Sequence, residues 1–207
     1  MSSEKHIIAS CVISNGIVEK NGTRLFEAHD GDVQAFLVNA YLHMGIDYPK
    51  FYKMDALSKL GWLASEILLK DEPSLKKYAP EEIAIVLGNA NASLDVDFKY
   101  YKTVEEIASP ALFVYTLPNI MIGEMSIRNG FKGENGFFIF DEFDAGFMET
   151  YVGGLMDSGT TKLCICGWVD VLGEDYHATL FLVENAGDDT ILFNKANMDK
   201  IFSGKKI

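Results

Sequence analysis

Residues 109–144 read SPALFVYTLPNIMIGEMSIRNGFKGENGFFIFDEFD, and this stretch decides the fold. It predicts four consecutive elements: a strand, a helix, a second strand and the start of a second helix. Thr116 is a suitable N-cap for the first helix, and Pro118 falls in its first turn, where a missing N–H costs nothing. Apolar residues recur at helical spacing over 120–127, and Asn129-Gly130 is a helix stop signal.

The second part of the stretch predicts a strand that leads directly into a helix. Gly136-Phe137-Phe138-Ile139-Phe140 is short and almost wholly apolar, which indicates a buried strand. Asp141-Glu142-Phe143-Asp144 then opens the next helix, where acidic residues in the first turn favour the helix dipole. On the helix before the strand, Glu124 and Arg128 have the i,i+4 spacing of an ion pair.

This arrangement resembles the β-ketoacyl synthase family of the thiolase superfamily. In that family a Thr-(Leu/Val)-Pro-Asn helix is followed by a Lys-Gly-Pro-Asn turn and a strand. Thr116-Leu117-Pro118-Asn119 and Lys132-Gly133-Glu134-Asn135 match this order, with Glu134 in place of the proline. The family's catalytic cysteine lies where the strand ends and a helix begins. Aligned without gaps, that nucleophile position falls on or next to Glu142, and no cysteine lies nearby.

The remaining sequence predicts further strands and helices in the order that the resemblance implies. Residues 33–44 are compatible with either a helix or a packed loop. The resemblance covers residues 53–184, and it implies an α/β fold: a thiolase-like half with a mixed, mainly parallel sheet and packed helices. Residues 1–207 would form a single domain, without the family's C-terminal half and its two catalytic histidines. The other expected elements are strands at 6–13, 82–88, 161–171, 176–184 and 191–193, a hairpin at 17–26 that turns at Asn21-Gly22, and helices at 54–69 (capped by Asp55), 95–101, 147–155 and near 198–202.

The resemblance also suggests contact residues. Lys53 matches one of the basic residues that precede a Met-Asp helix start in the family and help to dock the carrier protein, and Lys50 lies nearby. The alternative is that these lysines are only solvated residues at a helix end. In complete ketosynthases the strand equivalent to 136–140 pairs with its symmetry mate. The expected interface residues are therefore Phe137, Phe138, Ile139 and Phe140.

Composition limits the class of protein. The chain has 207 residues, is 48% hydrophobic and carries a net charge of −12. These values favour one domain with a substantial core and argue against nucleic acid or an anionic membrane as a partner. The three cysteines form no disulfide framework, Cys164 and Cys166 would share one face of a strand, and the expected compartment is the cytoplasm. The four histidines lack metal-ligand spacing, so no metal and no cofactor is expected.

Three functions remain open at this point. The first is a non-catalytic companion subunit in fatty-acid or polyketide-type synthesis, because a carboxylate is a poor substitute for the cysteine that holds an acyl thioester. The second is an acyl-thioester enzyme that condenses, decarboxylates or hydrolyses its substrate, related to the 3-oxoacyl-[acyl-carrier-protein] synthases, which are acyltransferases. In this case either a partner chain completes the enzyme by supplying the histidines, or Glu142 assists decarboxylation or hydrolysis of a carrier-bound acyl group. The third is a small-molecule binding or interaction protein.

Assembly with another chain is also expected. Half of a thiolase-type chain leaves an inner surface uncovered, including the apolar face of the 117–129 helix. Either the tail at 188–207 folds across this surface or a second chain covers it, and the small number of apolar residues in the tail favours a second chain. The expected partner is a second copy or a complete ketosynthase, together with a possible acyl carrier protein.

Overall fold

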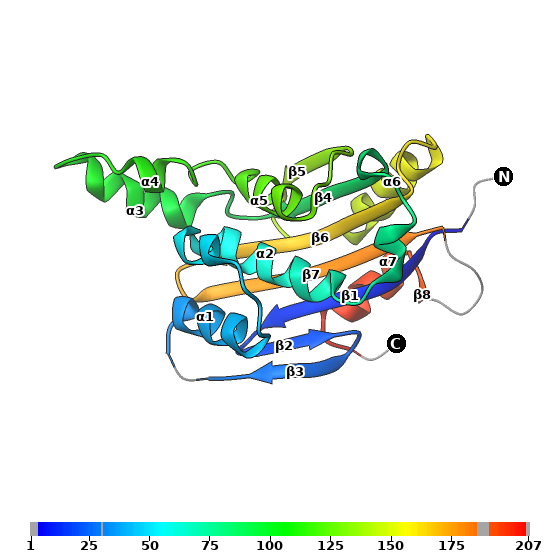
Figure 1. Ribbon diagram of the computed structural model, residues 1–207, viewed down its shortest axis with the longest axis horizontal. Coiled ribbons are helices and arrows are strands. Elements are labelled where there is room, and N and C mark those ends of the chain that lie inside the picture. The colour runs from blue at the N-terminus through cyan, green and yellow to red at the C-terminus, as the bar shows by residue number, and fades with distance from the viewer. Residues whose placement is uncertain (1–3, 30, 186–190, 206–207) are drawn as a thin grey trace.

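A single mixed β-sheet is the centre of the molecule. The computed structural model describes residues 4–29, 31–185 and 191–205. The eight strands have the order β3-β2-β1-β7-β6-β4-β5, and β8 pairs with β1 (Figure 1). The strands are β1 (His6–Ser14), β2 (Ile17–Lys20), β3 (Thr23–Glu27), β4 (Ile83–Asn89), β5 (Asn135–Ile139), β6 (Leu163–Leu172), β7 (Asp175–Glu184) and β8 (Ile191–Leu192).

The α/β class and the mixed sheet are confirmed, but the expectation of mainly parallel pairing is wrong. Only the β4–β5 and β4–β6 pairs are parallel. The other five pairs are antiparallel. For three of these pairs the reason is local, because β1–β2, β2–β3 and β6–β7 are joined by tight turns, and a short turn can join only antiparallel neighbours. At the turn of the predicted hairpin, Asn21 and Gly22 both have positive φ.

Helices cover both faces of the sheet. The α-helices are α1 (Val33–His43), α2 (Ala56–Leu69), α3 (Leu94–Val104), α4 (Pro110–Phe113), α5 (Ile120–Asn129), α6 (Ala145–Asp157) and α7 (Lys195–Phe202). Three short 3-10 segments lie between these elements: η1 (Pro49–Lys53) between α1 and α2, and η2 (Pro73–Lys76) and η3 (Pro80–Glu82) between α2 and β4. Residues 33–44, which the sequence left open as helix or loop, contain helix α1. Asp32 caps this helix by accepting a hydrogen bond from the Ala35 N–H.

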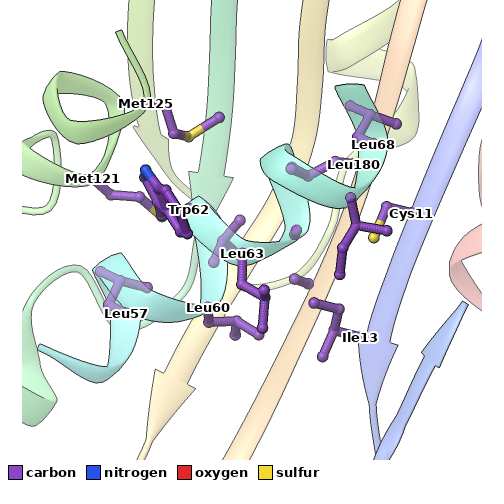
Figure 2. Close-up of a cluster of buried hydrophobic side chains, with 14 of the residues drawn as sticks. Cys11, Ile13, Leu57, Leu60, Trp62, Leu63, Leu68, Met121, Met125 and Leu180 are labelled. Carbon is purple, nitrogen blue, oxygen red and sulfur yellow. The ribbon is translucent and has the colours of Figure 1, made fainter. Parts of the chain in front are cut away.

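The larger core lies beneath α2. Leu60 and Leu63 of this helix are fully buried. Asp55 caps the first turn of the helix, as expected. Figure 2 shows these leucines between α2 and the sheet, with Trp62 on the side of α2 that faces α5. A Cβ placed on Gly61 would lie 1.9 Å from the Met121 Sδ, so α2 and α5 approach each other closely because this residue has no side chain.

The second face of the sheet is covered by α6 and α7. Met198 of α7 and Met148 of α6 are both fully buried, and Phe202 stacks on Phe143 with the ring centres 4.6 Å apart. The described part of the tail, 191–205, therefore packs with α6 on this face of the sheet, and not on the 117–129 helix that was expected to lack a cover. Few apolar residues are enough because three of them, Phe193, Met198 and Phe202, point into this layer.

The 117–129 region also departs from expectation. Its apolar residues Met121, Ile122 and Met125 are buried, and α5 packs on α2, so this face needs no other chain. Glu124 and Arg128 do not pair with each other: Glu124 contacts Lys50, and Arg128 forms hydrogen bonds with Glu66.

Two local predictions in the deciding stretch are wrong. The segment expected to be a strand before the helix contains the short helix α4, because Ser109 caps it and Pro110 occupies its first position. Thr116 does not cap α5, which begins only at Ile120. The Thr116 hydroxyl instead donates a hydrogen bond to the Phe113 carbonyl at 2.8 Å and so closes the turn after α4.

Candidate functional site

The carboxyl ends of three neighbouring strands meet at one end of the sheet. β4, β5 and β6 are parallel, so the segments that follow them lie together: the loop at 89–93, the β5–α6 connection at 140–144 and the end of β6 near Asp170. The Phe140 N–H donates to the Asn89 carbonyl at 3.0 Å and ties the first two segments together. In α/β proteins this end of a sheet is where ligands most often bind.

Glu142 lies in the β5–α6 connection, before the helix begins. Its side chain is exposed, and it lines neither of the two cavities described below. Asp141 is exposed as well, whereas Asp144 is the N-cap of α6 and accepts a hydrogen bond from the Phe147 N–H at 2.8 Å. The acidic run therefore serves helix initiation through Asp144, and the Glu142 side chain is left exposed.

None of the three cysteines lies at the strand end where a nucleophile is expected. Cys11 lies on β1, Cys164 and Cys166 lie on β6, and all three are buried. Cys164 and Cys166 share one face of β6, as predicted. Burial raises the pKa of the Cys11 and Cys166 thiols above the ordinary value, which disfavours the reactive thiolate.

The loop at 89–93 is held by Asp170, a residue that the sequence interpretation missed. The Asp170 carboxylate accepts hydrogen bonds from the Ala90 N–H at 3.2 Å, the Asn91 N–H at 3.0 Å and the Asn91 side-chain amide at 2.7 Å. The backbone N–H groups of Ala90 and Asn91, which could otherwise bind an anion, are thus occupied by the protein's own carboxylate. The sequence signal that could have pointed to Asp170 is that it is an isolated acidic residue in the otherwise apolar strand sequence WVDVL.

This arrangement makes Asp170→Asn a specific test. An asparagine places an N–H₂ donor where three donors converge, so we expect a loss of about 1.5–3 kcal/mol in the free energy of unfolding. Faster amide exchange at Ala90 and Asn91 should accompany the loss, measured by chemical denaturation and hydrogen exchange. Asp175→Asn, at an exposed position near the same sheet end, is the control and should change stability by less than about 0.5 kcal/mol. Equal effects of the two variants would contradict the assigned role.

The two candidate docking lysines have different environments. The Lys50 ammonium lies 2.7 Å from a carboxylate oxygen of Glu124, whose side chain is only 6% exposed. The Lys50 ammonium is therefore engaged in an ion pair within the chain. Lys53 is exposed at the end of η1, next to the exposed ring of Tyr52. The structure thus leaves Lys53 accessible for docking and gives Lys50 a structural role.

The strand β5 lies at the edge of the sheet, which corrects the prediction of a buried strand. None of its residues is fully buried, and Ile139 is 51% exposed. Phe138 packs on the second face against Phe147 and Tyr151, with ring centres 4.8 and 4.9 Å apart. One side of β5 pairs with β4, and among the described strands none pairs with its other side.

The described surface includes two cavities, one at this end of the sheet and one elsewhere. The one at this sheet end has about 560 Å3, and its lining includes Trp168, Asp170, Glu174 and His177. Glu174 is already engaged, since it accepts a hydrogen bond from the Val33 N–H at 2.8 Å, and burial lowers the pKa of His177. The other, about 510 Å3, lies between α6 and β8. Within the described residues there is no group of three or more metal-binding side chains, and no helix is long and apolar enough to span a membrane.

Comparison with solved structures identifies the fold. The chain aligns over 90% of its length with "The ishigamide ketosynthase/chain length factor", at a TM-score of 0.62 and 18% identity. The chain has a ketosynthase fold. It also aligns over 89% of its length with the ketosynthase of an AntDE:AntF complex (TM-score 0.61, 15% identity) and with the ApeO–ApeC ketosynthase and chain length factor of Xenorhabdus doucetiae (0.58, 12%).

The ketosynthase fold confirms the expected thiolase-like architecture. The chain spans 64% and 63% of the length of the first two of these structures and 80% of the third. No protein-family model and no curated protein matches the sequence. At these identities the likeness concerns the fold and assigns no role to Glu142, Lys53 or β5.

Proposed function

We propose that this protein is a non-catalytic, ketosynthase-like companion subunit in fatty-acid or polyketide-type biosynthesis, corresponding to the N-terminal half of the family fold. One observation carries the proposal: all three cysteines are buried in strands, and the strand-to-helix junction at 140–144 has no thiol. A condensing enzyme must hold its acyl chain on a nucleophile, and a helix N-terminus is where a thiol gains the low pKa it needs. Glu142, which is exposed, does not replace the missing nucleophilic thiol.

The companion role rests on the free edge of β5. An apolar edge strand without charged residues or proline offers unpaired N–H and C=O groups to another strand. The proposed interface is formed by Phe137, Phe138, Ile139 and Phe140, and the proposed partner is a ketosynthase-fold subunit. Two compared structures are described as complexes, AntDE with the acyl carrier protein AntF and ApeO with the chain length factor ApeC. By analogy, Lys53 is the residue of this chain proposed to meet a carrier protein.

The test is covalent loading with an acyl group. After incubation with an acyl-pantetheine thioester, we expect intact-mass spectrometry to show no adduct and the malonyl condensation assay to show no turnover above background. A complete ketosynthase is the positive control. Alkylation by iodoacetamide should likewise require denaturant, because the cysteines are buried.

An acyl adduct on any cysteine would contradict the proposal. Turnover that disappears in Glu142→Gln but persists in Asp141→Asn would instead support the second function, an acyl-thioester enzyme in which Glu142 takes part. Asp141 is the matched control because it is an exposed acid in the same connection.

A further inference from the structure

The larger cavity is formed by segments that are far apart in the chain. Its lining comes from the β1–β2 turn, the segment before α1, the start of α1, the end of β6 and the β6–β7 turn. Figure 1 shows α1 and the β6–β7 turn at the same end of the sheet. The volume of about 560 Å3 falls within the range of about 300–1,000 Å3 that small-molecule sites have. The cavity is therefore large enough to hold a small molecule.

The carboxylates in the wall of this cavity have no cation to balance them. The described lining contains Asp32, Asp170, Glu174 and Asp175, and it contains no lysine or arginine. The first three accept backbone hydrogen bonds, but a backbone N–H has no net charge and leaves their negative charge in place. The Asp175 side chain has no hydrogen bond or ion pair with another described residue. A cleft lined by charges of one sign concentrates ions of the opposite sign.

The two histidines of the lining do not supply the missing cation. Burial lowers the pKa of His177, which favours its uncharged ring, and Nε2 of this ring lies 2.7 Å from the Thr179 hydroxyl. Nε2 of His29 lies 2.8 Å from a carboxylate oxygen of Glu27. Any charge on His29 is therefore matched by Glu27 and does not offset the carboxylates of the cavity.

Trp168 brings an unpaired hydrogen-bond donor to the cavity wall. The residue is only 5% exposed, and its ring packs against Phe143 with the ring centres 6.3 Å apart. Its indole N–H has no acceptor among the described residues. The unpaired indole N–H of Trp62 is fully enclosed by the protein, whereas that of Trp168 is not, and Trp168 lines the cavity. Since an indole N–H can only donate, a molecule in the cavity has to supply the acceptor.

The carboxylates and the indole N–H together indicate one class of ligand. An ammonium group would balance the carboxylates, and a hydroxyl oxygen can accept the hydrogen bond from the indole. We propose that the cavity binds a small hydroxylated amine, with its ammonium group held by the carboxylates and a hydroxyl oxygen accepting from the Trp168 N–H. The proposal is independent of the non-catalytic role and of the β5 edge.

Glucosamine tests the proposal, and glucose is its neutral match because a hydroxyl replaces the ammonium group. The chain has two tryptophans, so a proton–nitrogen correlation spectrum shows two indole signals. We expect glucosamine to shift the Trp168 signal, with a dissociation constant of about 1 mM or tighter, and to leave the Trp62 signal unchanged. Glucose should bind at least about 10-fold more weakly, because it lacks the charge-assisted hydrogen bonds.

Substitutions test the two parts of the site separately. Trp168→Phe keeps an aromatic ring but removes the N–H, and it should weaken glucosamine binding about 5-fold by calorimetry. Asp175→Asn removes a carboxylate without a protein partner and should also weaken binding about 5-fold. Asp141→Asn is the matched control, because Asp141 is an exposed acid that does not line the cavity. Circular dichroism should show equal folding of the three variants, and the shift of the Trp168 signal needs no substitution.

Three results would overturn the proposal. The Trp168 signal does not move at about 20 mM glucosamine, glucose binds as tightly as glucosamine, or Asp141→Asn weakens binding as much as Asp175→Asn does. The last result would mean that the amine is attracted to the acidic chain in general. None of these results bears on the proposed non-catalytic role, which is judged by acyl loading, and an acyl adduct on a cysteine would likewise leave this site unaffected.

Discussion

Met198→Asp is expected to lower the free energy of unfolding by at least about 4 kcal/mol. Met198 is fully buried between α7, α6 and the second face of the sheet, in a cluster that is otherwise apolar. The substitution removes a well-packed side chain and places a carboxylate among groups that cannot pair with it. Urea denaturation followed by circular dichroism measures the loss.

The matched control is Ala196→Asp, which puts the same residue on the exposed side of the same helix. Because an acid in the first turn suits the helix dipole, this variant should change stability by less than about 0.5 kcal/mol. A small effect at Met198 would mean that α7 does not cover the sheet in solution. The surface beneath it would then be open to a partner.

Lys50→Ala is expected to cost about 2–3 kcal/mol of unfolding free energy. The substitution leaves the Glu124 carboxylate buried, with its side chain 6% exposed, and without its cation 2.7 Å away. Removing one partner of a fully buried ion pair costs about 3–5 kcal/mol, and the smaller value expected here reflects the 42% exposure of the Lys50 side chain.

A double-mutant cycle separates charge from packing. Glu124→Gln in the Lys50→Ala background should restore most of the lost stability, because a neutral amide is less costly to bury than a charge. Lys53→Ala is the control and should be within about 0.5 kcal/mol of the unmodified protein, because Lys53 is exposed. Equal effects of Lys50→Ala and Lys53→Ala would contradict the structural role of Lys50.

The sequence predicted most elements because their signals are local. The apolar run over 82–88 became the fully buried strand β4, and the Asn21-Gly22 turn fixed the β2–β3 hairpin. The ketosynthase-like order of motifs was also sufficient to predict the fold. Ser109-Pro110 was a helix start signal that was not recognised, since the apolar residues after it favoured a strand.

What the sequence did not predict depends on residues far apart in the chain. Whether Glu124 contacts Arg128 or Lys50 is decided by the neighbours of α5, because η1 brings Lys50 to Glu124 and α2 brings Glu66 to Arg128. The spacing of Glu124 to Arg128 alone suggested the wrong partner. The role of Asp170 arises only because β6 lies beside β4, which brings its carboxylate to a loop about 80 positions earlier. Likewise, the composition of Asn135–Ile139 is that of a buried strand, and only the strand order places it at the edge.

The position of β1 in the strand order has a consequence for how the chain folds. β1 pairs with β2 a few residues later, but its other neighbour is β7, with His6 opposite Glu184. The β1–β2–β3 meander can form as soon as it is synthesised, whereas the contact with β7 requires a loop of nearly the whole chain to close. Such long-range pairing is slow because the entropy of loop closure is lost before the contacts form. We therefore expect the middle of the sheet to be completed last, after β7 has been synthesised, with one edge of β1 unpaired until then.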